Sequence, residues 1–156
     1  MVRTDKDGYT LNEMMIVVAA IGVLAAMGSF AVLSATNKGK VKKAETEVEI
    51  LATATLQLAW DTGRWPNQKA RNNGGSTEIW DLLGDTSGLV GTDGSYTGWK
   101  GPYYNGDRLD PWGNPYFFDP DYRVGGVMRP VVGSFGPNGV GPNRYDSDDI
   151  YVLLDD

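Results

Sequence analysis

Apolar residues are concentrated near the start of the chain, in a run that carries no charge. From Met14 to Leu33 there are 20 residues without a charged side chain, and most of them are Met, Ile, Val, Leu, Ala or Phe. A helix rises about 1.5 Å per residue, so this run is long enough to cross the roughly 30 Å apolar core of a bilayer. The pattern therefore predicts a membrane-spanning helix.

A second, amphipathic pattern follows after a short polar segment. Apolar or small residues recur at intervals of three and four positions, at Val41, Ala44, Val48, Leu51, Thr55 and Leu58. This spacing predicts a helix with one buried face. No proline precedes Pro66, so both patterns fit one long helix from Tyr9 to about Asp61. Gly63 is placed to end it, whereas a break near residues 37–39 would give two helices.

The remainder of the chain is rich in Gly, Pro, Asn and aromatic residues, which indicates a small core with long loops. The apolar runs 116–118, 127–134 and 150–154 are candidate strands. A short helix through Leu83 is also expected, with Ser76 or Thr77 as its cap. Together these elements predict an α+β fold. Its long N-terminal helix, half in the membrane and half amphipathic, packs on a small antiparallel sheet of about three strands.

A short polar leader precedes the apolar run. It ends at Gly8, and Tyr9 begins the segment that leads into Glu13. A secretory signal peptide places its small-residue cleavage site after the apolar run, whereas here the small residue stands before it. Cleavage after Gly8 would remove the leader and keep the membrane helix. This arrangement resembles the class III signal of type IV pilins and pseudopilins, in which Glu occupies the fifth position of the processed chain.

Glu13 lies at the edge of the predicted span, where a carboxylate is costly unless it is paired. Cleavage after Gly8 would free an amine on Tyr9, and this amine in a neighbouring subunit is a natural partner for Glu13. The alternative is a carboxylate that lies at the level of the lipid headgroups and binds water. The leader and Gly8 favour the pairing, and with it a role for Glu13 in assembly.

Charge and composition restrict the function. The 156 residues carry a net charge of −6 and include neither Cys nor His. An acidic chain argues against nucleic-acid binding, and no thiol or imidazole is available for catalysis. Lys38, Lys40, Lys42 and Lys43 follow the span, and the positive-inside rule would keep this end in the cytoplasm. Charge therefore opposes the outward placement of the head that the pilin resemblance implies.

Further segments restrict the resemblance to one group within the type IV pilins and pseudopilins. The stretches DTGRWP at 61–66 and LDPWGNPY at 109–116 are similar to two signatures of the major pseudopilin family of type II secretion. The residues at 134–136 and 148–150 resemble the C-terminal calcium loop of that family. The resemblance implies three parts: a leader peptide at 1–8, a transmembrane and filament-core helix at 9–36, and a globular head at 37–156 that includes the calcium-type loop.

The same resemblance implies a structural protein that is not an enzyme. The chain would form a homopolymeric filament after a prepilin peptidase cuts before Tyr9, which would then be N-methylated. It would cross the lipid of the bacterial inner membrane once, with its head in the periplasm or outside the cell. Minor pseudopilins and the inner-membrane assembly platform would be its further partners.

Acidic residues before the last predicted strand are candidate ligands for Ca²⁺. Asp146, Asp148 and Asp149 cluster beside an Asn- and Gly-rich turn. Ca²⁺ takes six to eight hard oxygen ligands, which carboxylates, amides and backbone carbonyls supply. The resemblance implies binding by Asp148 and Asp149, completed by Asp146, by Asn138, which stands where the family usually has Asp, and by the carbonyl of Phe135. The alternative is a solvated acidic turn.

Three other functions are each compatible with part of the sequence. An N-terminally anchored enzyme would need a carboxylate pair such as Asp146 and Asp149, but no nucleophile accompanies them. A membrane-anchored extracytoplasmic binding module could use Trp99, Tyr103 and Tyr104 as a platform for sugars, although aromatic residues in loops more often pack on a core. A type IV pilin of a different filament system would share the processing signal.

Overall fold

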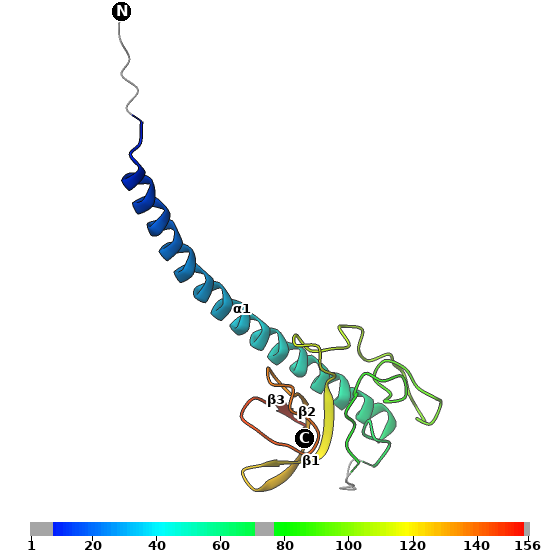
Figure 1. Cartoon of the computed structure of the whole chain (residues 1–156). Coiled ribbons are helices and arrows are strands. Elements are labelled where there is room, and N and C mark those ends of the chain that lie inside the picture. The colour runs from blue at the N-terminus through cyan, green and yellow to red at the C-terminus, as the bar shows by residue number, and fades with distance from the viewer. Residues whose placement is uncertain (1–7, 71–76, 155–156) are drawn as a thin grey trace, which may run out of the picture. The chain divides into compact units, whose positions relative to one another are not determined.

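The computed structural model describes residues 8–70 and 77–154. Apart from Gly8, the predicted leader lies outside the described residues. The chain forms two compact units, of which the first ends at Gly39 and the second begins at Lys40. One helix, α1 (Leu11–Thr62), contributes to both units (Figure 1). The prediction of one long helix is therefore confirmed, and the alternative of two helices is wrong.

In the first unit, α1 is an apolar helix that the described chain leaves uncovered. It is long and apolar enough to span a membrane, and none of its most apolar window is buried. Ile16 and Leu24, for example, are 62% and 69% exposed. The backbone remains helical through residues 28–31. An apolar surface of this extent requires a surrounding of lipid or of other apolar helices.

In the second unit, α1 buries the predicted stripe. Ala44, Val48, Leu51, Thr55 and Leu58 are all fully buried, and Val41 at the start of the stripe is partly buried. The helix ends as predicted, because Gly63 adopts a φ of +70° and its N–H donates to the carbonyl of Ala59 at 2.9 Å. The 3–4 spacing therefore predicted the helix face that forms the core of the head.

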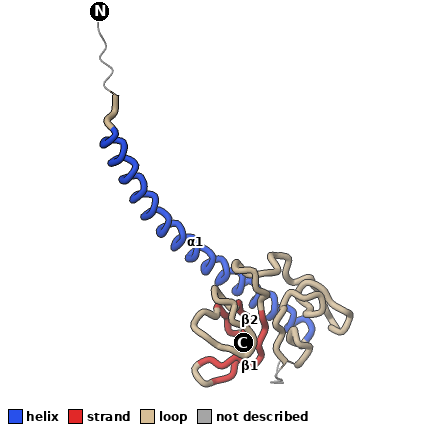
Figure 2. Tube along the Cα trace, viewed as in Figure 1, coloured by secondary structure: helices blue, strands red, loops and turns tan. Residues whose placement is uncertain are grey.

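Three antiparallel strands form the sheet in the order β1–β2–β3 (Figure 2). They are β1 (Phe117–Val124), β2 (Val127–Ser134) and β3 (Ile150–Leu153). β1 is longer than the predicted run because the turn Gly125–Gly126 closes a hairpin with β2. Both glycines have a positive φ, +57° and +86°, as a tight two-residue turn requires. A bulge between Asp119 and Tyr122 accommodates Pro120.

Both faces of the sheet are buried. Phe118 and Val132 are cross-strand partners, and they pack with the buried stripe of α1 in the larger hydrophobic cluster. The adjacent residues Phe117 and Val131 belong to a second cluster, together with Tyr122 and Phe135. Successive residues of a strand point to opposite faces. The α1 helix therefore covers one face, and side chains from the segment after β2 contribute to the cover of the other.

The predicted short helix through Leu83 is wrong. Ile79 instead pairs with Phe118 in an isolated antiparallel bridge, in which each N–H donates to the other residue's carbonyl at 2.8 Å. Leu82 and Leu83 are buried in the larger cluster. Pairing with the edge of β1 satisfies the backbone and buries the leucines, so tertiary contact overrides the local helix signal. Ser76, one proposed cap, lies outside the described residues.

Ion pairs hold the loops along one side of α1. Lys43 Nζ lies 2.7 Å from Asp107 Oδ2, and Lys100 Nζ lies 2.7 Å from Asp61 Oδ1. The hydrogen bond and charge of Lys100 lower the pKa of Asp61, and the hydrogen bond from Lys43 lowers the pKa of Asp107. Exposed pairs of this kind stabilise a fold only slightly. Their main effect is to position the long loops of the head against the helix.

Candidate functional site: the start of α1 and the loop between β2 and β3

A reciprocal cap forms at the beginning of α1. The N–H and the hydroxyl of Thr10 donate to Glu13 Oε2 at 2.9 and 2.8 Å, and the N–H of Glu13 donates to Thr10 Oγ1 at 3.3 Å. This capping box was missed at the level of sequence, although its Thr-x-x-Glu spacing is visible there. Gly8 and Tyr9 directly precede it, and Tyr9 is 81% exposed. The described chain therefore leaves the Gly8–Tyr9 bond accessible.

Asp110 organises the turn in the DPWGNPY stretch. Its Oδ1 accepts hydrogen bonds from the N–H groups of Trp112 and Asn114 at 3.0 and 2.8 Å, although the residue is only 5% exposed. Its Oδ2 accepts a hydrogen bond from the Ser134 hydroxyl at 2.6 Å. Ser134 Oγ in turn accepts from the N–H of Gly136 at 3.0 Å. One buried carboxylate thus connects this turn to the end of β2 and to the loop that follows.

The predicted calcium-ligand residues lie in one hydrogen-bonded loop between β2 and β3, but Asp146, Asp148 and Asp149 are not a group of described carboxylates whose oxygens converge within 4.8 Å. Asn138 Nδ2 donates to Asp146 Oδ2 at 3.0 Å, and the N–H of Asp148 donates to Asp146 Oδ1 at 2.9 Å. At Gly136, an added Cβ would lie only 1.9 Å from the carbonyl oxygen of Asp148. The backbone next to Phe135 therefore lies directly against the acidic segment, and only glycine permits this approach.

Asp149 supplies an observation that points to a cation. Its Oδ2 accepts hydrogen bonds from the Tyr122 hydroxyl at 2.7 Å and from the N–H of Asp146 at 3.3 Å. Its Oδ1 is buried and has no hydrogen-bond partner in the described chain. Burial raises the pKa of Asp149, and the charges of Asp146 and Asp148 add to the rise. Because an unpaired buried oxygen is costly, these residues fit a hard cation such as Ca²⁺.

A second group of carboxylates lies beside β1 and is not evident from the sequence. Oxygens of Glu78, Asp119 and Asp121 lie within 4.8 Å of one another. Asp119 is fully buried, and its Oδ1 accepts a hydrogen bond from the N–H of Asp121 at 2.8 Å. The available signal was an Asp-Pro-Asp segment that directly follows two apolar residues. That signal did not reveal the approach of Glu78, which comes from a distant part of the chain.

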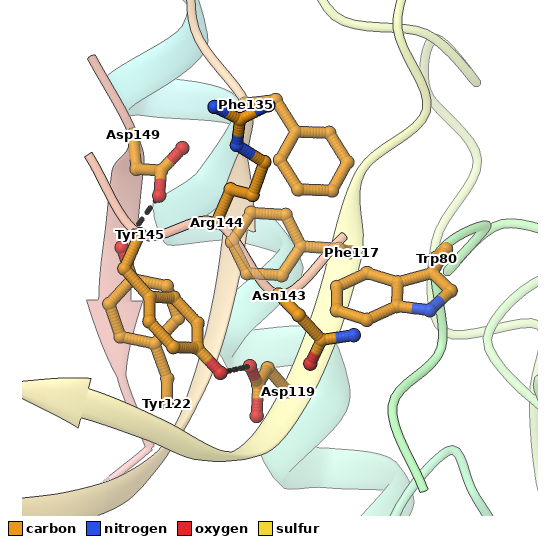
Figure 3. A pocket seen from close by; sticks show the side chains of 9 residues that line it. All are labelled: Trp80, Phe117, Asp119, Tyr122, Phe135, Asn143, Arg144, Tyr145 and Asp149. Carbon is orange, nitrogen blue, oxygen red and sulfur yellow. Dashed lines mark hydrogen bonds between the residues drawn. The ribbon is translucent and has the colours of Figure 1, made fainter. Parts of the chain in front are cut away.

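Two tyrosines connect Asp119 to the acidic loop (Figure 3). The Tyr145 hydroxyl donates to Asp119 Oδ2 at 3.3 Å, and the Tyr122 hydroxyl donates to Asp149 Oδ2 at 2.7 Å. The two rings meet edge to face, with 4.5 Å between their centroids. The loop between β2 and β3 is therefore tied to β1 at two partly or fully buried carboxylates.

Replacing Asp119 with Asn is expected to raise the free energy of unfolding of the head at pH 8. Burial, together with the Asp121 and Glu78 carboxylates, raises the pKa of Asp119 to about 7. A carboxyl whose pKa is raised in the folded state adds stability at low pH, and this stability is lost as the pH rises through 7. Asn keeps an acceptor without the charge, so the gain should reach on the order of 2–3 kcal/mol above pH 7.

Urea unfolding of a fragment that begins at Lys40 measures this effect at acidic and at alkaline pH. The fragment contains all residues of both hydrophobic clusters. Asp93→Asn is a matched control, because hydrogen bonds from Ser95 lower the pKa of Asp93, so this variant should gain nothing at pH 8. A gain from Asp119→Asn that does not depend on pH would contradict proton uptake by Asp119.

The aromatic residues of the Gly-rich segment are used in packing. The indole N–H of Trp99 donates to the carbonyl of Gly88 at 2.7 Å, and the Tyr103 hydroxyl donates to Asp61 Oδ2 at 3.1 Å. Tyr104 is 7% exposed and belongs to the larger hydrophobic cluster. Trp99 and Tyr103 pack against the same cluster. These rings do not form the open platform that a sugar-binding module would require.

The fold and the N-terminal site define a class of protein. An uncovered apolar helix begins at a Gly8–Tyr9 junction with Glu13 close behind, and the same helix continues into the core of a small α+β head. This architecture is that of a pilin-like subunit with one apolar N-terminal helix that is long enough to span a membrane. No family model and no solved structure matches the chain.

Comparison with known proteins identifies the family. The chain is 31% identical over 149 residues to type II secretion system core protein G of Xanthomonas campestris, an alignment that covers 94% of this chain and 90% of the relative. The protein of the same name from Pseudomonas aeruginosa is 28% identical over 94% of this chain and 96% of its own length. That from Aeromonas hydrophila is 27% identical over 74% of each. The chain belongs to the family of type II secretion system core protein G, the major pseudopilin.

Proposed function

We propose that this chain is the major subunit of a secretion pseudopilus, a filament in which its own copies polymerise through α1. The observation that carries the proposal is the uncovered apolar helix with Glu13 near its start, in a chain whose relatives are named type II secretion system core protein G. The apolar part of α1 requires an apolar surrounding. Lipid supplies it before assembly, and the helices of other copies supply it in the filament.

The proposal includes the maturation and location of the chain. A prepilin peptidase cuts between Gly8 and Tyr9, and Tyr9 is then N-methylated. The mature subunit crosses the bacterial inner membrane once, as one apolar helix allows, and carries its head in the periplasm or outside the cell. Minor pseudopilins and an inner-membrane assembly platform are its partners. Its role is structural, and no residue is assigned a catalytic step.

The subunit purified from assembled filaments is expected to begin at Tyr9. Its intact mass should correspond to the loss of residues 1–8 and the gain of one methyl group, and electron microscopy of the same preparation should show filaments. Gly8→Val should block cleavage because the peptidase requires a small residue before the cut, and this variant should accumulate in the membrane without filaments. A retained Met1, or a cut after Leu33, would contradict the proposal.

We further propose that the loop between β2 and β3 binds Ca²⁺. The carboxylates of Asp148 and Asp149 would hold the ion, with Asp146, Asn138 and the Phe135 carbonyl as further ligands. The support is the unpaired buried oxygen of Asp149 and the close approach of the two loop segments at Gly136. Bound there, the ion would supply neutralising charge. Asp149 and its partner Tyr122 would then hold the loop against β1.

The head is expected to melt at a higher temperature in Ca²⁺ than in chelator. A ligand bound only by the native state stabilises it by RT ln(1 + [L]/Kd), which is about 2.7 kcal/mol at a hundredfold excess over Kd. Mg²⁺ should substitute poorly because it demands tighter octahedral geometry. Asp149→Ala should remove the difference, and Asp93→Ala, outside the loop, should preserve it. Coincident melting curves and no heat of binding in calorimetry would show that the loop is a solvated turn.

A further inference from the structure

The described head leaves two complementary surfaces uncovered. The first, the tip surface, consists of Arg123 and Met128 beside the β1–β2 turn. The second, the helix stripe, lies on α1 and consists of Lys42, Thr46, Glu49, Thr53, Gln57 and Trp60. All of these residues are exposed. Both surfaces belong to the compact unit that begins at Lys40.

The tip surface continues the face of the sheet that packs on α1. The bulge lies on β1, so β2 alternates regularly and Met128, Pro130 and Val132 share one face. Along this face the exposed fraction rises from 0% at Val132 to 59% at Met128. Arg123 is the cross-strand partner of Met128 and therefore stands beside it. A helix-binding face thus ends in an apolar and cationic pair that no described residue covers.

The helix stripe lies on the side of α1 opposite the buried stripe. Its members recur at intervals of three and four positions, which places them on one helix face. Trp60 is 68% exposed and is the one aromatic side chain on this otherwise polar face. A large exposed indole of this kind is typical of the residues that dominate binding at protein interfaces.

We propose that the tip surface of one copy packs on the helix stripe of a second copy, with Arg123 and Met128 against the ring of Trp60. The inference rests on the proposed filament function and assigns residues to one of its subunit contacts. An arginine guanidinium is attracted to the face of an indole, and a methionine thioether packs favourably against aromatic rings. The tip therefore supplies a cation and a thioether, and the stripe supplies the aromatic ring that both of these groups bind.

A second copy is the occupant that fits both surfaces. An open helical filament is built from heterologous contacts, which join two different patches of the same chain. The stripe faces away from its own sheet, so the tip and the stripe of one copy do not meet. Arg123 gives the tip a positive charge on a chain of net charge −6, and the stripe carries one charge of each sign, on Lys42 and Glu49. The fit to a second copy therefore depends on the guanidinium of Arg123 and the thioether of Met128 against the Trp60 ring.

Paired cysteines test the contact directly, because the chain has none of its own. The full chain carrying both Trp60→Cys and Met128→Cys is assembled into filaments and treated with a short bis-maleimide. A ladder of covalent dimers, trimers and longer products is expected from the double variant, whereas each single variant should give no covalently linked products. The matched control combines Trp60→Cys with Tyr151→Cys, because Tyr151 pairs with Gly133 on the opposite face of the sheet from Met128.

A ladder from the Trp60 and Met128 pair without one from the control pair supports the contact. Loss of filaments in both single variants, with normal filaments from Tyr151→Cys, supports it as well. Filaments without a ladder, or an equal ladder from the control pair, overturn the contact and leave the filament function standing. Absence of filaments from the unsubstituted chain overturns the filament function and the contact together.

Discussion

Replacing Glu13 with Ala is expected to abolish filaments while the head remains folded. In the proposed filament, the Glu13 carboxylate pairs with the free amine of Tyr9 in a neighbouring copy within an apolar environment. Removing one partner of a buried ion pair costs about 3–5 kcal/mol, and each 1.4 kcal/mol changes an equilibrium about tenfold. Filament yield, measured by shearing and electron microscopy, should therefore fall by more than about a hundredfold. The melting temperature of the head should not change.

Glu13→Gln separates the two roles of this residue. Within its own chain Glu13 caps α1 through Thr10, and Gln can also serve in a capping box. Gln cannot pair as a charge with an amine. If the charge is what assembly requires, Glu13→Gln should lose filaments nearly as completely as Glu13→Ala, whereas Thr10→Ala should retain them. Normal filaments from Glu13→Gln would show that Glu13 acts only as a helix cap.

Gly136→Ala is expected to destabilise the head by about 2–5 kcal/mol, because a left-handed residue with a Cβ costs roughly 1–2 kcal/mol and a steric overlap costs roughly 1–3 kcal/mol. Gly136 has a φ of +64°, and the new Cβ would lie 1.9 Å from the carbonyl oxygen of Asp148. Backbone cannot yield as a flexible side chain can, so the acidic loop should separate from the end of β2. Urea unfolding should show the loss, and any effect of Ca²⁺ on melting should disappear with it.

Gly125→Ala is the matched control for this prediction. Gly125 has a similar φ of +57°, but no neighbouring atom lies within 4 Å of its added Cβ. Gly125→Ala should therefore lose only the free energy of placing a Cβ in a left-handed backbone conformation, about 1–2 kcal/mol, and its melting should still respond to Ca²⁺. Equal losses from the two variants would mean that the close approach to Asp148 adds nothing to stability.

Elements with local signals could be predicted from the sequence. The apolar run, the 3–4 stripe and Gly63 predicted α1 to within a few residues, and the runs at 127–134 and 150–154 correspond closely to β2 and β3. β1 was predicted too short, because Pro120 normally interrupts a strand and only the bulge and the Gly125–Gly126 turn permit the longer hairpin. The helix predicted through Leu83 failed because pairing of Ile79 with Phe118 is a contact between distant segments.

The residues of the candidate site likewise include some that the sequence predicts and others that only the fold brings together. The acidic run at 146–149 and the Gly8–Glu13 segment are readable because their residues are neighbours along the chain. The group formed by Glu78, Asp119 and Asp121 is not, since it exists only where the segment before β1 pairs with that strand. The Tyr145 hydrogen bond to Asp119 likewise requires the loop to fold back over the sheet.

By itself the sequence determined the long apolar helix and the family resemblance, and it predicted the place of a processing signal, because short stretches of consecutive residues carry each of them. The tertiary structure alone decided which carboxylates lose water. Asp119 is fully buried and has a pKa of about 7, and Asp149 has one buried oxygen without a partner in the described chain, whereas Asp146, which belongs to the same acidic run as Asp149, is exposed. The physical reason is that the charge and binding capacity of a carboxyl depend on the solvent, donors and charges around it in space, and the fold brings these from distant parts of the chain.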